Sequence, residues 1–305
     1  MNLTGSPRKI DLKDRSLVTI SLRTGNPEVF LFEPESGNAT NLSNWPGSCQ
    51  RYPSWSPGGN QVVFTSDKDG TFNLYLLDLT GEATRQLTHY KHPVVAGMQS
   101  WTPDGKGIYF SVFGDGVPKI CRHLLETGAT EMIGEGIDPA LSPDGRTMAF
   151  ARHLPNGHCL FAAKADGLDV RQLTFQENRF AGMHPAWTPD GKFVIYADRV
   201  GEALELFACD PGGKEARQLT FLGQAATSPS VSPDGKFISF RLCDEIYWRD
   251  PAISERTYRE KRADKRPVWV MESDGSHPQP IEALRYQMTI DGSRAAWRPA
   301  GGTNS

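Results

Sequence analysis

A turn signature that recurs every 40 to 46 residues, the apolar runs that follow it, and a Gln-Leu-Thr triplet that ends three repeats predict an all-β fold, a six-bladed β-propeller. Within the signature, Pro fixes φ for a turn and Gly supplies a positive φ, so the chain reverses there. A repeat of this length has room for four short antiparallel strands, which is the size of one propeller blade. The five copies are Ser56-Pro57-Gly58-Gly59, Thr102-Pro103-Asp104-Gly105, Ser142-Pro143-Asp144-Gly145, Thr188-Pro189-Asp190-Gly191 and Ser232-Pro233-Asp234-Gly235.

Each repeat divides into four predicted strands in chain order. The first is a short segment that ends just before the signature, and its last residues are Trp55, Trp101, Leu141, Trp187 and Val231. The second is the apolar run after the signature, such as 61–64 or 237–240. The third is the next alternating run, such as 73–78 or 205–209, and the fourth ends in Gln-Leu-Thr.

The two chain ends hold complementary parts of one more blade. Segments 17–20, 28–32 and 40–43 fit a second, third and fourth strand, and 297–301 fits a first strand with its turn. We therefore expect a split blade in which the C-terminal strand pairs with the N-terminal ones. The expected organisation is a tail at 1–15, a single propeller at 16–301 with an insertion at 243–266, and a tail at 302–305.

The repeated x-Pro-x-Trp-Ser-Pro-Asp-Gly pattern with its terminal Gln-Leu-Thr resembles the TolB-like (PD40-type, WD40-like) β-propeller family over residues 16–301. Prolyl-oligopeptidase-like peptidases use a similar propeller beside a hydrolase domain that carries a G-x-S-x-G motif. That motif does not occur in this sequence, so the resemblance implies no peptidase activity here. TolB itself has an additional N-terminal domain, so its partners are not carried over either.

Composition excludes several other classes of protein. The chain has 33 basic and 36 acidic residues among 305, so phosphate-driven nucleic-acid binding is not expected. No apolar run reaches the roughly 18 residues of a membrane helix. The five cysteines are widely spaced, which predicts buried free thiols. The N-terminus lacks the apolar core of a signal peptide, which favours a cytoplasmic location, or a periplasmic one if a signal peptide was removed.

The best candidate for a binding site is the face where one repeat connects to the next, together with the turns between second and third strands. We call this the loop face. Loops of this kind are longer and more varied than the Pro-Asp-Gly turns on the opposite face, and loops carry function on rigid scaffolds. Repeat alignment places six residues at equivalent positions around the channel mouth: Tyr52, Met98, Asp138, His184, Ser228 and Arg294. The predicted ligand-binding set is Tyr52, Asp138, His184 and Arg294 with their loop neighbours Arg51 and Gln99.

The insertion in the fifth repeat is the second candidate. It adds about 20 residues between a second and a third strand, and long insertions in tight repeats are often functional. Two interpretations stay open. The insertion is either a lid or partner-docking element that carries Tyr247, Trp248 and Arg249, or a solvated excursion of the surface.

The third candidate is a metal site. Oligogalacturonate lyases resemble this propeller family and hold a catalytic divalent metal with His and Gln side chains. The resemblance therefore implies a set of His89, His92 and His184, with Gln99 as a further donor, for an ion such as Mn or Ca. The alternative is that these are ordinary hydrogen-bonded loop histidines. His123, His153, His158 and His277 receive no role.

Two functions follow from these candidates. The first is a non-catalytic module, without a cofactor, that binds a protein, peptide or glycan on the loop face. The alternative is a metal-dependent lyase that acts on an acidic oligosaccharide, with Arg51, Arg179 and Arg294 as carboxylate ligands. The oligomeric state is not predicted.

Overall fold

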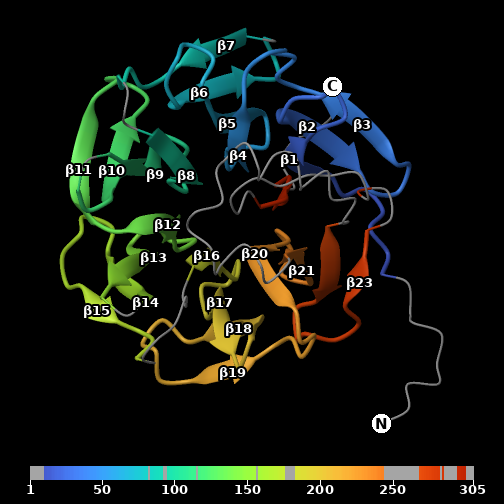
Figure 1. The fold of residues 1–305 in the computed structure, drawn as a ribbon, viewed down its shortest axis with the longest axis vertical. Coiled ribbons are helices and arrows are strands. Elements are labelled where there is room, and N and C mark those ends of the chain that lie inside the picture. The colour runs from blue at the N-terminus through green and yellow to red at the C-terminus, as the bar shows by residue number, and fades with distance from the viewer. Residues whose placement is uncertain are drawn as a thin grey trace.

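The chain folds into sheets that surround a common centre (Figure 1). The structure, a computed structural model, describes residues 10–81, 83–91, 95–114, 116–155, 157–175, 183–243, 268–281, 284 and 294–299. Throughout these ranges the regular elements are β-strands, with no α-helix. The all-β, propeller-like prediction is therefore confirmed. No helix in the same ranges is long and apolar enough to cross a membrane.

Each repeat forms its own antiparallel sheet, in chain order. The first sheet has the order β24-β1-β2-β3, with β24 at Ala296–Trp297, β1 at Leu17–Ser21, β2 at Glu28–Glu33 and β3 at Asn38–Asn41. The second holds β4 (Gln50–Trp55), β5 (Gln61–Ser66), β6 (Asn73–Asp78) and β7 (Ala83–Gln86). The third holds β8 (Val95–Trp101), β9 (Gly107–Phe113), β10 (Lys119–Leu124) and β11 (Thr130–Glu135). The fourth holds β12 (Ile137–Leu141), β13 (Thr147–Leu154), β14 (Gly157–Lys164) and β15 (Arg171–Gln172).

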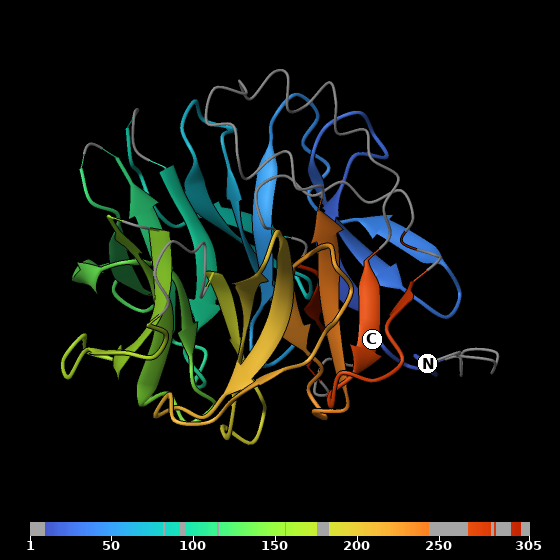
Figure 2. The same cartoon turned by 60° about the horizontal axis from the view of Figure 1, so that its bottom comes forward.

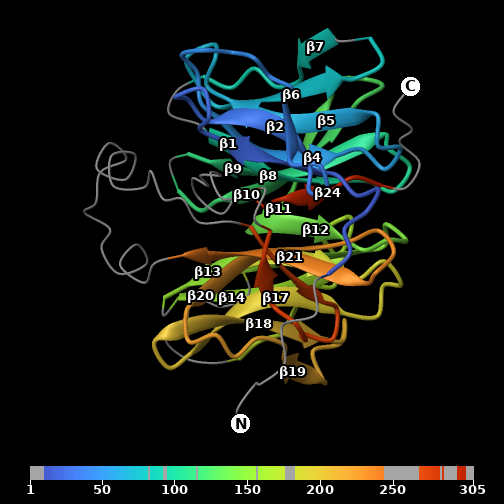
Figure 3. The ribbon, with the colours of Figure 1, turned by 90° about the vertical axis from the view of Figure 1, so that its right-hand side faces the viewer.

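The remaining strands follow the same pattern. They are β16 (Met183–Trp187), β17 (Val194–Val200), β18 (Ala203–Cys209), β19 (Ala216–Gln218), β20 (Ala225–Val231), β21 (Phe237–Cys243), β22 (Trp269–Glu272) and β23 (Gln279–Pro280). One parallel pair, Leu204↔Ala225, joins β18 to β20, so these strands count as one sheet of eight. The inner strands β4, β8, β12, β16 and β20 lie nearest the centre, and β7, β11, β15 and β19 lie at the rim (Figure 1). Tilted and edge-on views show the strands running across the thickness of the disc (Figures 2 and 3).

A strand near the N-terminus and a strand near the C-terminus pair in the first sheet. Leu17 pairs with Trp297 and Val18 with Ala296, so β24 is the inner neighbour of β1. The core is divided among the interfaces between consecutive sheets, and one of its clusters joins Leu17 and Phe32 of the first sheet to Val270 of β22. The predicted tail before residue 10 and the inserted segment after Cys243 lie outside the described residues, so those boundaries stay predictions.

The Gln-Leu-Thr triplet has a clear structural reason. In the second sheet the Thr88 hydroxyl accepts the backbone N–H of Leu74 at 2.9 Å, and the Gln86 amide donates to the carbonyl of Thr88 at 2.8 Å. Leu87 is buried between them. The same bonds recur at the triplets 172–174 and 218–220. The triplet therefore ends the outer strand by satisfying backbone groups that no further strand would pair.

The tryptophans that end inner strands join sheets in pairs. The indole N–H of Trp101 donates to Ser54, that of Trp187 to Ala140, and that of Trp297 to Ser230, each at a backbone carbonyl 2.9–3.2 Å away. These bonds occupy every second interface. At the other interfaces the equivalent residues are Leu141 and Val231, which have no donor, and Trp55, whose Nε1 has no hydrogen-bond partner among the described residues.

Candidate functional site

Five of the six predicted channel-mouth residues share one unusual backbone conformation. Their φ values lie between 52° and 58°, where non-glycine residues are uncommon, and they are Tyr52, Met98, Asp138, His184 and Ser228. Each lies where the register of the inner strand shifts against its neighbour, which marks a β-bulge. A bulge re-aims side chains. The repeat alignment thus identified a position at which each inner strand turns its side chains away from the regular pleat.

Asp138 and His184 form the central pair of this ring. One oxygen of Asp138, Oδ2, accepts the backbone N–H of His184 at 2.9 Å and lies 3.1 Å from Nδ1 of the same residue. Both side chains are buried, with 1% and 3% of each residue exposed. The other oxygen, Oδ1, is buried without a hydrogen-bond partner among the described residues. An ionised carboxylate accepts several hydrogen bonds, so Oδ1 has acceptor capacity that the described residues do not use.

Comparison of the third and fourth sheets explains why residue 138 is an aspartate. In the third sheet the hydroxyl of Ser111 accepts the bulge N–H of Asp138 at 3.0 Å. The matching position in the fourth sheet is Ala151, which pairs with Ile137 as Ser111 pairs with Gly97 and which has no acceptor. Asp138 supplies that missing acceptor to His184. Oδ2 of this carboxylate therefore has a structural role, and Oδ1 takes no part in it.

Charge keeps Asp138 ionised. Burial acts to raise the pKa of Asp138, but the charge and hydrogen bonds of His184 and the charge of Arg294 outweigh burial, so the pKa lies below its ordinary value. Burial lowers the pKa of Arg294, and Asp138 opposes that shift. Arg294 Nη2 also donates to the carbonyl of Pro185 at 3.3 Å. The structure thus brings Asp138, His184 and Arg294 together electrostatically, from three separate repeats.

Other predicted mouth residues are engaged within the propeller. Gln99 Nε2 donates to the hydroxyl of Thr65, and its Oε1 is buried with no hydrogen-bond partner in the described ranges. The guanidinium of Arg51 lies 4.4 Å from the ring centroid of Phe72. The ring of Tyr52 packs against Gly97, where a Cβ would come within 2.9 Å of it.

The predicted metal and lid residues are less completely placed. His89 is exposed after β7, whereas His184 is buried beside Asp138, and His92 lies outside the described residues. Within the described part of the chain no three His, Cys, Asp or Glu side chains gather as a metal site. The predicted metal set therefore stays a prediction. Tyr247, Trp248, Arg249 and Arg179 also lie outside the described residues.

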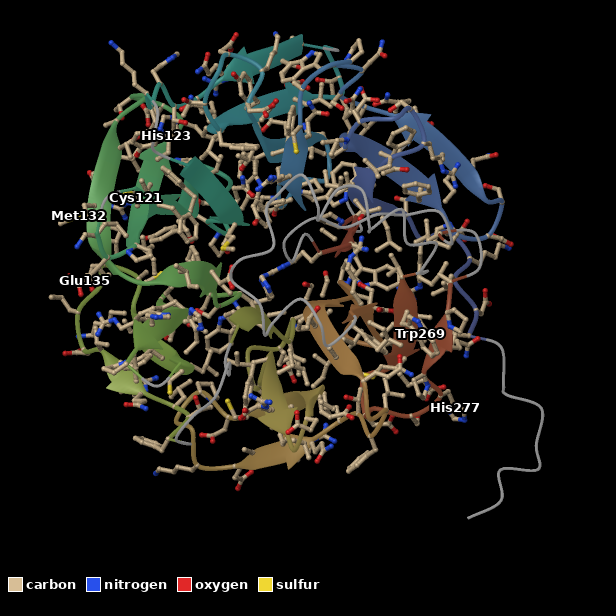
Figure 4. The ribbon with its side chains drawn as sticks, in the orientation of Figure 1. Cys121, His123, Met132, Glu135, Trp269 and His277 are labelled. Carbon is tan, nitrogen blue, oxygen red and sulfur yellow. The ribbon has the colours of Figure 1, made fainter. Side chains whose placement is uncertain are left out.

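A pocket beside the mouth is the feature that sequence reasoning missed. It has a volume of about 510 Å³ and lies between the third and fourth sheets. Its apolar wall comes from Phe113, Val117, Pro118 and Ile137, and its polar groups are Glu135, Arg152, His153 and His158. Glu135 ends β11, toward the rim of the disc (Figure 4). The pocket opens where β9 turns into β10 and β13 turns into β14, so it belongs to the loop face.

His153 and His158, which were assigned no role from the sequence, form a pair in the lining of this pocket. His153 and His158 are directly opposite each other in the β13–β14 hairpin, with Nδ1 of His153 3.1 Å from Nε2 of His158. Burial, the charge of His153 and the charge of His184 lower the pKa of His158 to about 4, against the opposing effect of Asp138. The signal was present in the sequence, because the run Pro-Asn-Gly at 155–157 is a turn signature between two strands, and a hairpin closed there pairs residue 153 with residue 158.

The sheets and their repeated turns define a β-propeller with a polar mouth on its loop face. The family model described as "TolB beta propeller domain" (PD40) matches residues 9–136 and 100–247 of this chain. These matches together span more than half of the sequence, so the chain belongs to the TolB-type β-propeller family.

Curated relatives match over parts of their length. A Protein TolB homolog of Chlorobium chlorochromatii is 35% identical over 85 residues, which is 27% of this chain and 19% of the relative. Dipeptidyl-peptidase 5 of Porphyromonas gingivalis is 34% identical over 117 residues, 36% of this chain and 17% of the relative. The match thus spans about a fifth of either relative. Neither name supports the expected cytoplasmic location.

Solved structures share the fold. TolB from Acinetobacter baumannii superposes with a TM-score of 0.69 at 19% identity, over 95% of this chain and 68% of that one. An oligogalacturonate lyase from Vibrio parahaemolyticus superposes with a TM-score of 0.58 at 17% identity, over 92% of this chain and 78% of that one. At these identities the likeness is one of fold.

Proposed function

We propose that the chain is a non-catalytic binding module that takes up a protein, peptide or glycan segment on its loop face. The observation that carries the proposal is Oδ1 of Asp138, a buried ionised acceptor without a hydrogen-bond partner among the described residues. Leaving such a group unpaired is costly, so a ligand that donates to it gains binding free energy. Arg294 beside it favours a ligand that also carries an acidic group.

We also propose that the propeller closes as six blades, with one blade completed by the C-terminal strand. Support comes from contacts between the first sheet and strands β20–β23. Arg15 pairs with Asp234 at 2.7 Å, and Arg241 Nη2 donates to the Thr19 hydroxyl at 2.8 Å. Removal of residues 293–305 deletes β24 and exposes a strand edge, so the variant is expected to aggregate or to lose several kcal/mol of stability. An unchanged melting temperature would contradict closure.

The metal-dependent lyase is the alternative that the same experiments address. A likeness in fold to an oligogalacturonate lyase suggests that function, but the predicted metal set includes His92, which lies outside the described residues. A lyase would release unsaturated uronic acid products from oligogalacturonate in the presence of Mn²⁺ or Ca²⁺. Formation of those products by the purified chain would replace the binding proposal with the catalytic one.

The binding proposal is tested by a thermal-shift screen of acidic peptides and of acidic and neutral oligosaccharides, followed by calorimetry on each hit. Arg294→Ala is expected to weaken binding of an acidic hit by about 1.5–3 kcal/mol, the value of a charged hydrogen bond. Arg217→Ala on the exposed strand β19 is the matched control and is expected to bind like the parent. Equal binding by the parent and Arg294→Ala would place the ligand elsewhere.

A further inference from the structure

The paired imidazoles at the pocket between the third and fourth sheets have the separation of two ligands on one metal ion. Nδ1 of His153 and Nε2 of His158 lie 3.1 Å apart. Two nitrogens that bind one ion at about 2.0–2.1 Å and are this far apart subtend an angle of about 100° at it. That angle lies between the octahedral and tetrahedral values. We propose that His153 and His158 form a two-histidine site for a divalent transition metal.

The hairpin holds this pair in place before any ion arrives. His153 and His158 occupy opposing positions of an antiparallel ladder that continues through Arg152↔Cys159 and Leu154↔Gly157. The neighbouring Arg152 is anchored in turn, because its Nε donates to the carbonyl of Glu135 at 3.0 Å. Ligands that are already positioned lose little conformational freedom on binding, which favours the ion.

The pocket leaves room for the rest of the coordination sphere. His153 is exposed and both rings line a space of about 510 Å³, so solvent and an ion reach them. The described residues bring no third His, Cys, Asp or Glu into a metal-binding group. Water, or an oxygen of a molecule in the pocket, would fill the other positions, as in metal sites that keep open positions.

Ligand chemistry selects the ion. Two neutral imidazoles suit copper, nickel and zinc, whereas calcium and magnesium require oxygen donors. Copper(II) is expected to bind most tightly, in keeping with the general order of divalent affinities. The site differs in every residue from the set His89, His92 and His184, and it does not depend on the proposed binding function.

The experiment is a calorimetric titration of protein purified without a histidine tag, using Cu²⁺, Ni²⁺, Zn²⁺ and Mg²⁺ separately. We expect one equivalent of Cu²⁺, Ni²⁺ or Zn²⁺ to bind, and Mg²⁺ to give no heat. His153→Ala and His158→Ala are each expected to weaken binding by at least the 10–100-fold that loss of a supporting group costs a metal site. Electron paramagnetic resonance of the Cu²⁺ form should show hyperfine coupling to two imidazole nitrogens, which fall to one in either variant.

His277→Ala is the matched control. His277 is a surface histidine on the opposite side of the disc from Glu135 (Figure 4), and its substitution should leave the affinity unchanged. His158→Gln provides a second variant that keeps a polar side chain in case His158→Ala disturbs the hairpin. The proposal is overturned if Cu²⁺, Ni²⁺ and Zn²⁺ all fail to bind, or if the His153 and His158 variants bind them as well as the parent does. In either case the pair shares a proton and not a metal.

Discussion

Asp138 reaches across an interface between two sheets and accepts the backbone N–H of His184, while the same oxygen lies 3.1 Å from that residue's ring. The contact joins two bulges that occupy equivalent positions in consecutive repeats. At the preceding interface the corresponding bond runs from the backbone N–H of Asp138 to the hydroxyl of Ser111. A stabilising contact and a candidate ligand-binding acceptor therefore belong to one carboxylate, and substitutions can separate the two roles.

Asp138→Ala should destabilise the fold strongly. It removes the acceptor of the His184 N–H and the anion beside Arg294, and breaking a buried charge pair costs about 3–5 kcal/mol. Asp138→Asn keeps an acceptor oxygen and should lose less. Urea unfolding at pH 7 measures both. The folded-state pKa of Asp138 is lowered, so its contribution is complete above the unfolded value of 3.8 and is lost as the pH falls below it. Equal stability of the two variants would show that the acceptor is unimportant.

The stability of the protein should fall between pH 6.5 and pH 4 because of His158. Its pKa is 6.5 when unfolded and about 4 when folded, so in this window the unfolded chain binds more protons than the folded one. Stability therefore rises with pH across the window, by about 1–3 kcal/mol for this group. His158→Gln, compared with the parent by urea unfolding in the presence of a chelator, should flatten that part of the profile. Parallel profiles would contradict the assignment.

Trp297→Phe should cost more stability than Trp55→Phe. Both side chains end inner strands and are 5% exposed, but only Trp297 donates its indole N–H to a carbonyl, that of Ser230. Trp55 Nε1 has no hydrogen-bond partner in the described ranges. The change in size is the same, and loss of the indole hydrogen bond should add about 0.5–1.5 kcal/mol to the cost at Trp297. The Arg298 guanidinium, 5.1 Å from the ring centroid of Trp55, can still lie over a phenylalanine ring in Trp55→Phe. Thermal or urea unfolding gives the comparison, and a larger loss for Trp55→Phe would refute it.

Gly136→Ala should destabilise the fold more than Gly116→Ala. Both glycines line the pocket and have positive φ, so both substitutions pay a backbone cost. A Cβ at Gly136 would lie 2.6 Å from the ring of Phe150 and 3.0 Å from the carbonyl of Ala151, but one at Gly116 meets nothing within 4 Å. We expect Gly136→Ala to be the less stable by about 1–3 kcal/mol, the cost of overpacking. Similar melting temperatures for the two would contradict this.

The repeated architecture was predictable because its causes are local. Thr102, Asp104 and Gly105 bond to one another and to the next residues within a single turn, and such bonds recur in the other copies. Alignment of the repeats also found the bulge position, although not its positive φ. Four of the five bulge residues are followed by proline, which was the available signal for an irregular strand: Pro53, Pro139, Pro185 and Pro229.

The particular site was less predictable because it depends on contacts between repeats. Nothing near Asp138 in the sequence shows that Ala151, on another strand, lacks an acceptor for His184. The pairing of His153 with His158 depended on the register of one hairpin, which the turn at 155–157 encodes but which was not used. Packing between repeats decided the environment of Asp138, and local sequence patterns report such packing poorly, whereas the histidine pair is a local feature of one hairpin.

The alternation of indole bonds means that consecutive seams of the propeller, the interfaces between its sheets, are joined by different groups. Between the third and fourth sheets, backbone N–H groups donate to the hydroxyls of Ser100 and Ser111, and no indole bond is present among the described residues. The pocket lies at a seam where Leu141 replaces tryptophan, between β8–β11 and β12–β15. A molecule bound in the pocket would contact both sheets and so stabilise the interface between them. Hydrogen exchange of the β12 amides should then slow when the pocket fills, while exchange at the indole-bonded seams stays the same. Binding in the pocket would then be detected as slower opening of the interface between two sheets, including at amides that do not contact the ligand.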